Sequence, residues 1–143
     1  MGRCTLLSRN SHLRGDTDAR VTAGPKSPHL GVCPGPNFPL KGRIFEQGDD
    51  AVVVKSGINH EGRRRAMPSE EIVIRNCTIN DGHAMLSIGS ELSGGVKNVL
   101  MEDCHAEKTV DKVFFVKSNP ERGGFVENVT VRRIKALDVK YEA

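Results

Sequence analysis

The chain has 143 residues, which suits one domain and is too short for two ordinary ones. Hydrophobic residues make up 37% and charged residues 27%, as in a folded globular chain rather than a collagen, a coiled coil or a disordered tail. No apolar run approaches the roughly 20 residues that span a bilayer, so we expect no membrane insertion. The net charge of +3 is compatible with an anionic ligand but too small to favour nucleic acid.

The N-terminal region and the cysteines carry no targeting or metal signal. The longest apolar stretch near the start is Leu6-Leu7, shorter than the roughly 7–15 residues of a signal-peptide core, so no export signal is visible. The four cysteines have irregular spacings and form no C-x-x-C motif, which predicts neither a zinc site nor a dense disulfide framework. We therefore expect no cofactor from these residues.

The first 42 residues differ in character from the rest. Residues 22–40 hold five of the seven prolines and show neither a helical nor a strand periodicity. This pattern predicts an irregular or disordered segment over residues 1–42 and an ordered domain over residues 43–143.

From residue 43 onward, short runs rich in β-branched residues recur, each closed by Gly, Asn, Asp or a charged turn. Such runs are typical of strands of about four to six residues. They are AVVVKSG (51–57), EIVIRNC (71–77), HAMLSIG (83–89), NVLMEDC (98–104), KVFFVKS (112–118) and NVTVRRI (128–134).

The six runs fall into two interleaved series with a repeat near 30 residues. One series aligns Cys77 with Cys104 and Ile134, and the other aligns Val54 with Ile88 and Val116. The repeat predicts an all-β fold in which at least two strands per coil stack in parallel as a solenoid, and it disfavours the alternative β-sandwich. Because only three to four coils fit and no cap is visible, we expect a piece of a larger solenoid.

The strand alternation conflicts with the expected burial at one place. In a flat strand Arg75 and Cys77 face the same side, although an arginine belongs outside and this cysteine, stacked on Cys104, belongs inside. We therefore expect a bend near Asn76 that resets the alternation.

Four polar residues at the ends of strands in one series are candidates for chemistry. Asp49 and Asp50 follow a glycine that permits a bend, so both carboxylates can line one groove and divide acid and base roles between them. His83 begins the next strand of the series, and Lys117 ends the one after it. Each alone is more often a turn or a solvated residue. Stacked coils, however, would bring all four to one stripe, with a cation for an anionic ligand.

These residues lie in motifs that resemble a known family. The strings GDDAVVVKSG, MPSEEIVIRNCTINDGHAMLSIGSELSGGVKNV and VKSNPERGGFVENV are similar to the active-site half of glycoside hydrolase family 28, the polygalacturonases. The resemblance covers roughly residues 43–137.

The resemblance implies a right-handed parallel β-helix and inverting hydrolysis of galacturonosyl linkages in pectin, without a metal. It implies that Asp49 is the general acid, that Asp50 helps to activate water and that His83 holds or tunes the acid. Lys117 would bind a galacturonate carboxylate. It also implies a secreted or periplasmic enzyme. No feature of the sequence indicates an oligomeric state.

The sequence departs from the family pattern at two places. Phe115 stands where the family has an arginine, so Arg122 or the run Arg63–Arg65, expected in a loop, would have to supply the second cation. The Asn-Thr-Asp segment one coil before Asp49 is missing, and Asp16-Thr17-Asp18 is only a superficial echo of it. We therefore expect the chain to be weakly active or inactive, since acid and base contributions are each about 100- to 10,000-fold.

Two other functions remain as alternatives. A non-catalytic β-helix module could bind acidic polysaccharide through Lys55, Lys117, Arg122 and the arginine run. A basic nucleic-acid binder is disfavoured because the chain has no Trp and a single Tyr, so it lacks interleaved aromatic residues.

Overall fold

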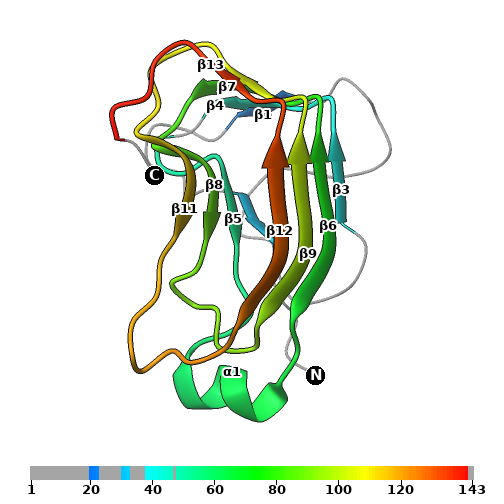
Figure 1. Ribbon diagram of the computed structural model, residues 1–143, viewed down its shortest axis with the longest axis vertical. Coiled ribbons are helices and arrows are strands. Elements are labelled where there is room, and N and C mark those ends of the chain that lie inside the picture. The colour runs from blue at the N-terminus through cyan, green and yellow to red at the C-terminus, as the bar shows by residue number, and fades with distance from the viewer. Residues whose placement is uncertain (1–19, 23–29, 33–37, 47, 142–143) are drawn as a thin grey trace.

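The computed structural model describes residues 20–22, 30–32, 38–46 and 48–141 (Figure 1). Its strands belong to three sheets, and every pairing between neighbouring strands is parallel. The first sheet, in spatial order, consists of β1 (Arg20–Thr22), β4 (Ile44–Glu46), β7 (Thr78–Asp81), β10 (His105–Ala106) and β13 (Lys135–Ala136). The second consists of β11 (Lys112–Val116), β8 (Ala84–Ile88), β5 (Val52–Val54) and β2 (Leu30–Val32). The third consists of β12 (Val126–Arg132), β9 (Val96–Glu102), β6 (Ser69–Arg75) and β3 (Phe38–Lys41).

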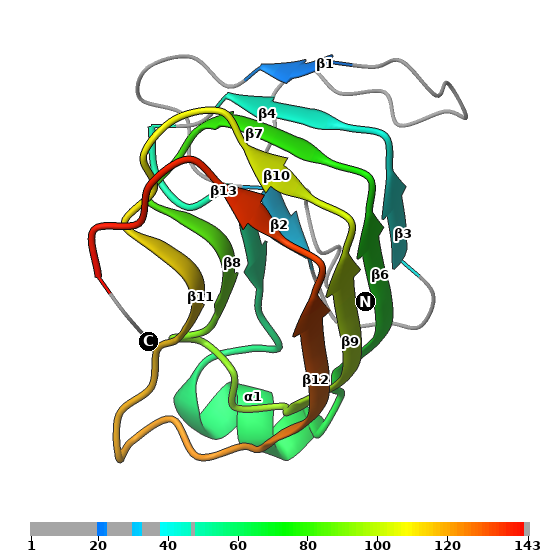
Figure 2. The same cartoon turned by 45° about the horizontal axis from the view of Figure 1, so that its top comes forward.

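The chain visits the three sheets in a fixed order, so that each winding adds one strand to each sheet. Figure 2 shows the strands of the first sheet lying side by side above the other two walls. This arrangement is the predicted short parallel β-helix, and the two strand series are its second and third sheets. The first sheet was not predicted, because its strands have only two to four residues and lack β-branched runs.

The core consists of columns of apolar residues at equivalent positions of successive windings. Val54 pairs with Ile88 and Ile88 with Val116, as the sequence alignment predicted; Val54 and Ile88 are fully buried, whereas Val116 in the last winding is exposed. Similar columns run through the other two sheets, for example Ile72 beside Val99 and Phe45 beside Ile79. Because each winding buries its apolar residues only against its neighbours, the stack supplies the hydrophobic stabilisation.

A sharp corner after the third sheet confirms the expected bend near Asn76. Its backbone φ of 54° is left-handed, and the equivalent residues Gly42, Asp103 and Arg133 have φ values of 60°, 54° and 53°. The bend turns Arg75 outward and leaves the Cys77 side chain fully buried. Cys77 and Cys104 are free thiols that stack inside the solenoid, as predicted.

Within residues 1–42, predicted as an irregular segment, the described residues include three short strands, and each adds one strand to a sheet by pairing with β4, β5 or β6. The remaining residues of this segment lie outside the described ranges. The arginine run, predicted as a loop, forms α1 (Asn59–Arg65), which Ala66 ends with a left-handed φ of 47°. Ion pairs from Arg64 and Arg65 to Glu61 stabilise this short helix. No helix among the described residues is long and apolar enough to cross a membrane.

Candidate active site

The two adjacent aspartates lie at the turn between β4 and β5. The backbone N–H of Asp50 donates a hydrogen bond of 2.8 Å to Oδ1 of Asp49, which fixes the turn as an aspartate cap does. The two carboxylates differ in environment: the Asp50 side chain is 5% exposed and that of Asp49 is 49% exposed. The turn therefore holds one buried and one accessible acid.

His83 lies one winding after Asp49. Its backbone N–H donates to the Asp49 carbonyl oxygen at 3.1 Å, and its Nδ1 atom lies 3.9 Å from Oδ1 of Asp49. The imidazole is 63% exposed, so it faces the solvent side of the turn rather than the core. This position puts the imidazole within ion-pair distance of the accessible carboxylate.

Lys117 follows β11, the last strand of the second sheet. Its Nζ atom donates to Oδ2 of the buried Asp50. This ion pair gives the buried carboxylate the charged partner that burial requires. The structure thus brings together the four predicted residues Asp49, Asp50, His83 and Lys117.

Gly89 allows the backbone carbonyl group of Lys117 to approach closely. It sits between Lys55 and Lys117 in one column, with a φ of +92°. A Cβ atom at this position would lie 2.1 Å from the carbonyl oxygen of Lys117, far inside contact distance. Only glycine fits here, and its absence would displace the lysine.

A cavity of about 140 Å³ lies at this wall. It is lined by Asp50, His83, Ala84, Asp111, Lys112, Phe115 and Lys117. Arg122, predicted to bind substrate, is not among these residues: its guanidinium donates to Asn59 Oδ1, and its backbone carbonyl accepts a 3.1 Å hydrogen bond from Arg63. Arg64 and Arg65 pair with Glu61 on α1. None of these arginines supplies the second cation at the cavity.

Asp111 is a third carboxylate that sequence reasoning missed. Its N–H donates to the His83 carbonyl oxygen at 2.7 Å, so Asp49, His83 and Asp111 occupy successive windings. The 2.7 Å ion pair with Lys140 lowers the pKa of Asp111, and this effect outweighs the opposing effect of burial. The signal was present in the sequence, because Asp49, His83 and Asp111 have the same spacing as Val54, Ile88 and Val116.

Lys112 is the second cation at the cavity. Its Nζ atom lies 4.7 Å from the ring centroid of Phe115 and 4.5 Å from that of Tyr141. The Nζ atom of Lys117 lies 5.4 Å from the same Phe115 ring. Phe115 therefore serves as an aromatic platform under two ammonium groups, an arrangement stabilised by cation–π attraction.

Comparison with known proteins identifies the family. Residues 31–143 match the profile of the family described as glycosyl hydrolases family 28. The chain belongs to glycosyl hydrolase family 28. A relative agrees with this assignment. This chain is 31% identical to a "Probable polygalacturonase" of Vitis vinifera over 137 residues, which cover 95% of this chain and 28% of that protein.

A solved structure agrees with this family 28 assignment. The hyperthermoactive exopolygalacturonase of Thermotoga maritima superposes with a TM-score of 0.67 and is 32% identical. The match covers 77% of this chain and 28% of that one, so the chain spans little more than a quarter of either relative. Among the described residues, no group of three His, Cys, Asp or Glu side chains is arranged to hold a metal ion.

Proposed function

We propose that this chain hydrolyses galacturonosyl linkages in polygalacturonate, the acidic polymer of pectin, by inverting general acid/base catalysis. The observation that supports the proposal most strongly is the convergence of Asp50, His83 and Lys117 on one cavity from three successive windings. Family membership and the two polygalacturonase relatives support the reaction class and the substrate. They also support a secreted or periplasmic location.

The two aspartates divide the chemistry. Asp49, which is accessible and lies beside His83, donates a proton to the leaving glycosidic oxygen, and His83 holds this acid in place. Asp50, which is buried and fixed by Lys117, accepts a proton from the attacking water. Attack of that water from the face opposite the leaving group inverts the anomeric centre.

The two lysines recognise the substrate's charge. Each galacturonate unit carries one carboxylate, and the Lys112 ammonium lies over the rings of Phe115 and Tyr141 at the edge of the cavity. Lys117, already paired with Asp50, supplies a second positive charge to the same cavity. Together they take the place of the arginine that Phe115 replaces.

The winding that precedes Asp49 lacks an acidic residue, and this lowers the activity that we expect. The sequence contains no Asp or Glu from Ala19 to Phe45, so the winding before Asp49 offers no carboxylate to share the activation of water. Loss of one acid or base contribution costs about 100- to 10,000-fold in rate. We therefore propose slow hydrolysis. The same observation favours a second candidate function, a non-catalytic module that binds acidic polysaccharide at this wall.

Release of reducing ends from polygalacturonate separates the two functions. The wild-type chain is compared with Asp50→Asn and with a matched exposed substitution, Asp138→Asn, at equal protein concentration. Hydrolysis predicts slow release that Asp50→Asn abolishes and Asp138→Asn leaves unchanged. Binding of the polymer with release no faster than in Asp50→Asn would favour the module.

A further inference from the structure

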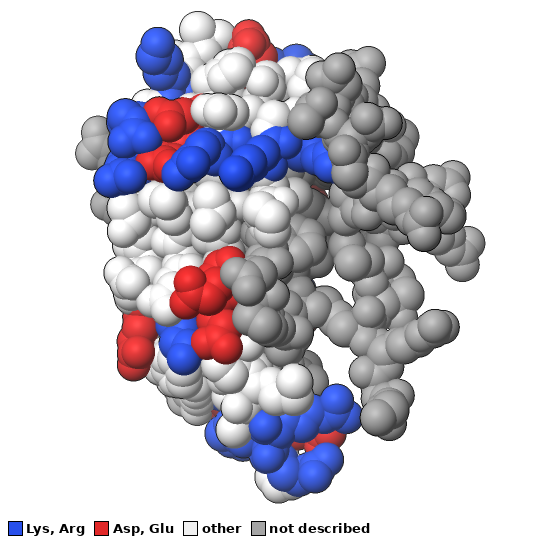
Figure 3. All heavy atoms as spheres, turned by 90° about the vertical axis from the view of Figure 1, so that its right-hand side faces the viewer, with Lys and Arg blue, Asp and Glu red and all other residues white. Residues whose placement is uncertain are grey.

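The outer face of the third sheet carries a row of mostly basic residues that are distant in the sequence but adjacent in space. Lys41, Arg75, Glu102 and Arg132 are mutual register partners on β3, β6, β9 and β12. Arg133 adds a further cation at the end of β12. We call these five residues the basic row. Figure 3 shows it as a band of Lys and Arg across this face, with carboxylate atoms at one place within it.

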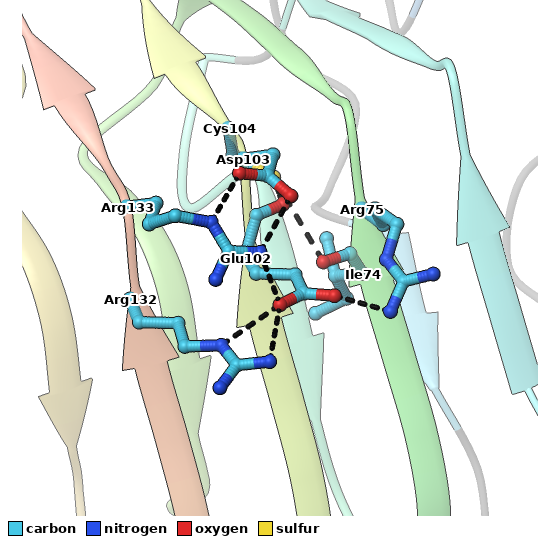
Figure 4. Close-up of polar contacts among 7 residues, drawn as sticks. All are labelled: Ile74, Arg75, Glu102, Asp103, Cys104, Arg132 and Arg133. Atoms are coloured by element: carbon cyan, nitrogen blue, oxygen red, sulfur yellow. Dashed lines mark hydrogen bonds and ion pairs between the residues drawn. The ribbon is translucent and has the colours of Figure 1, made fainter.

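Glu102 holds the arginines of the basic row in fixed positions. Its side chain is 2% exposed and accepts hydrogen bonds from Arg132 Nε at 2.8 Å and Arg133 Nη2 at 2.6 Å, while Arg75 forms a further ion pair (Figure 4). Arg133 also donates to Asp103 at 2.6 Å. These partners restrict the guanidinium groups before any ligand arrives, which lowers the entropic cost of binding one.

The cations outnumber the acids that they contact. Three arginines of the basic row pair with two carboxylates, Glu102 and Asp103, and Lys41 is the register partner of Arg75, so the four cations exceed the two acids by two positive charges. The arginine side chains also remain accessible, with 39% exposed for Arg75, 54% for Arg132 and 53% for Arg133. Balancing a single buried glutamate does not require three exposed arginines.

A less polar strip runs beside the basic row. Pro39, Val73, Leu100 and Thr130 are register partners two residues earlier on the same four strands, so they share the outward face. Val73 and Leu100 at its centre are half-buried. Both rows run across the strands, along the axis of the solenoid, with neighbouring positions about 4.7–4.9 Å apart.

We infer that this face is a second binding surface for a linear polyuronate, separate from the cavity on the second sheet. Carboxylates along one side of the polymer would pair with the guanidinium groups, and the C–H faces of its sugar rings would pack on the strip. The choice of a uronate rests on the proposed function. A chain held here raises the local concentration of other segments of the polymer at the cavity.

Binding of oligogalacturonate is measured by calorimetry in the Asp50→Asn background, in which the ligand is not consumed. Lys41→Gln combined with Arg132→Gln should weaken binding about three- to tenfold and flatten its dependence on salt. Arg132→Lys, which keeps the charge but loses the planar fork, should give a smaller loss. Lys97→Gln is the matched control, since Lys97 lies on the same face but pairs with Glu70 outside the basic row.

Unchanged affinity in the folded double variant would overturn the inference. Lys41→Gln alone leaves the contacts of Glu102 intact, so it tests the loss of one charge even if the double variant does not fold. Equal competition by double-stranded DNA at the same charge concentration would also overturn the inference, because the surface would then be a general polyanion site. Equal affinity for fully methyl-esterified oligomer would do the same. If binding persists while wild-type protein releases no reducing ends, the hydrolase proposal fails and this surface stands.

Discussion

The Nζ atom of Lys117 contacts Oδ2 of Asp50 although 67 positions separate the two residues in the chain. The contact exists because each winding returns the chain to the second sheet, so the residues of β5, β8 and β11 lie side by side. The ion pair is part of the proposed catalytic geometry and also stabilises a buried carboxylate.

Lys117→Met should therefore affect both activity and stability. Loss of the ammonium leaves Asp50 buried without its cation, and because Lys117 is itself 36% exposed we expect a stability loss of only about 1–2 kcal/mol. Hydrolysis of polygalacturonate should fall by about 100-fold or more. Urea unfolding and reducing-end assays measure the two effects. Lys108→Met, which removes an exposed pair with Asp81, is the control and should change neither by much.

Gly89→Ala should displace the lysine without removing it. The added methyl would collide with the Lys117 carbonyl oxygen, and alanine is strained at a φ of +92°. We expect a loss of about 2–3 kcal/mol in unfolding free energy and a drop in activity similar to that of Lys117→Met. A fully active and equally stable variant would show that the close approach of this backbone is not needed.

A ladder of hydrogen-bonded polar side chains on the third sheet should contribute to stability. Asn98 Nδ2 donates to Glu71 Oε1 at 2.6 Å, Asn128 Nδ2 donates to Asn98 Oδ1 at 2.7 Å, and all three residues have left-handed φ values of 51–56°. Asn98→Ala loses the hydrogen bonds and strains the backbone, so it should cost about 1–3 kcal/mol. Asn98→Gly should cost less because glycine tolerates this φ. Thermal unfolding that ranks alanine as the milder change would contradict the explanation.

Stability should depend on pH through Glu102. Hydrogen bonds from Arg132 lower the pKa of Glu102 below its ordinary value of 4.5, against the opposing effect of burial, and Arg75 and Arg133 lower it further. A carboxyl group whose pKa is lower in the folded state stabilises the fold above its unfolded pKa, and this contribution is lost as the pH falls through the folded pKa.

The difference in melting temperature between wild type and Glu102→Gln should accordingly be large at pH 7 and shrink below pH about 4. Asp103→Asn provides a comparison, because Arg133 lowers the pKa of Asp103 in the same direction at a more exposed site. A difference for Glu102→Gln that stays constant from pH 7 to pH 3 would exclude the ion pairs as its cause.

The sequence allowed the repeat and the main site to be predicted because β-branched runs mark the second and third sheets. The alignment of Val54 with Ile88 and Val116 follows directly from those runs, and with it the approach of Asp49 and His83. The first sheet was missed because strands as short as His105–Ala106 carry no pattern. Helix α1 was missed because its stability comes from ion pairs within a stretch of seven residues rather than from apolar periodicity.

Other functional features could not be predicted because they depend on contacts between residues that are distant in the sequence. The alignment that placed His83 also placed Asp111, but Lys112 gains its role from Phe115 and Tyr141, which are close to it only in space. Similarly, nothing in the string NVLMEDC distinguishes Glu102 from a solvated residue. Its burial depends on Arg75 and Arg132 from the windings on either side.

The left-handed corner shared by Gly42, Asn76, Asp103 and Arg133 bears on how such a protein changes in evolution. Every winding begins and ends at this corner. Duplication of one winding therefore adds one strand to the sheet that carries the cavity and one to the sheet that carries the basic row, and it leaves the pairing within the other windings unchanged. Inserting a single residue within a strand instead moves every following side chain in that strand out of alignment. Growth by whole windings thus lengthens the grip on a polymeric ligand without rebuilding the residues that act on it.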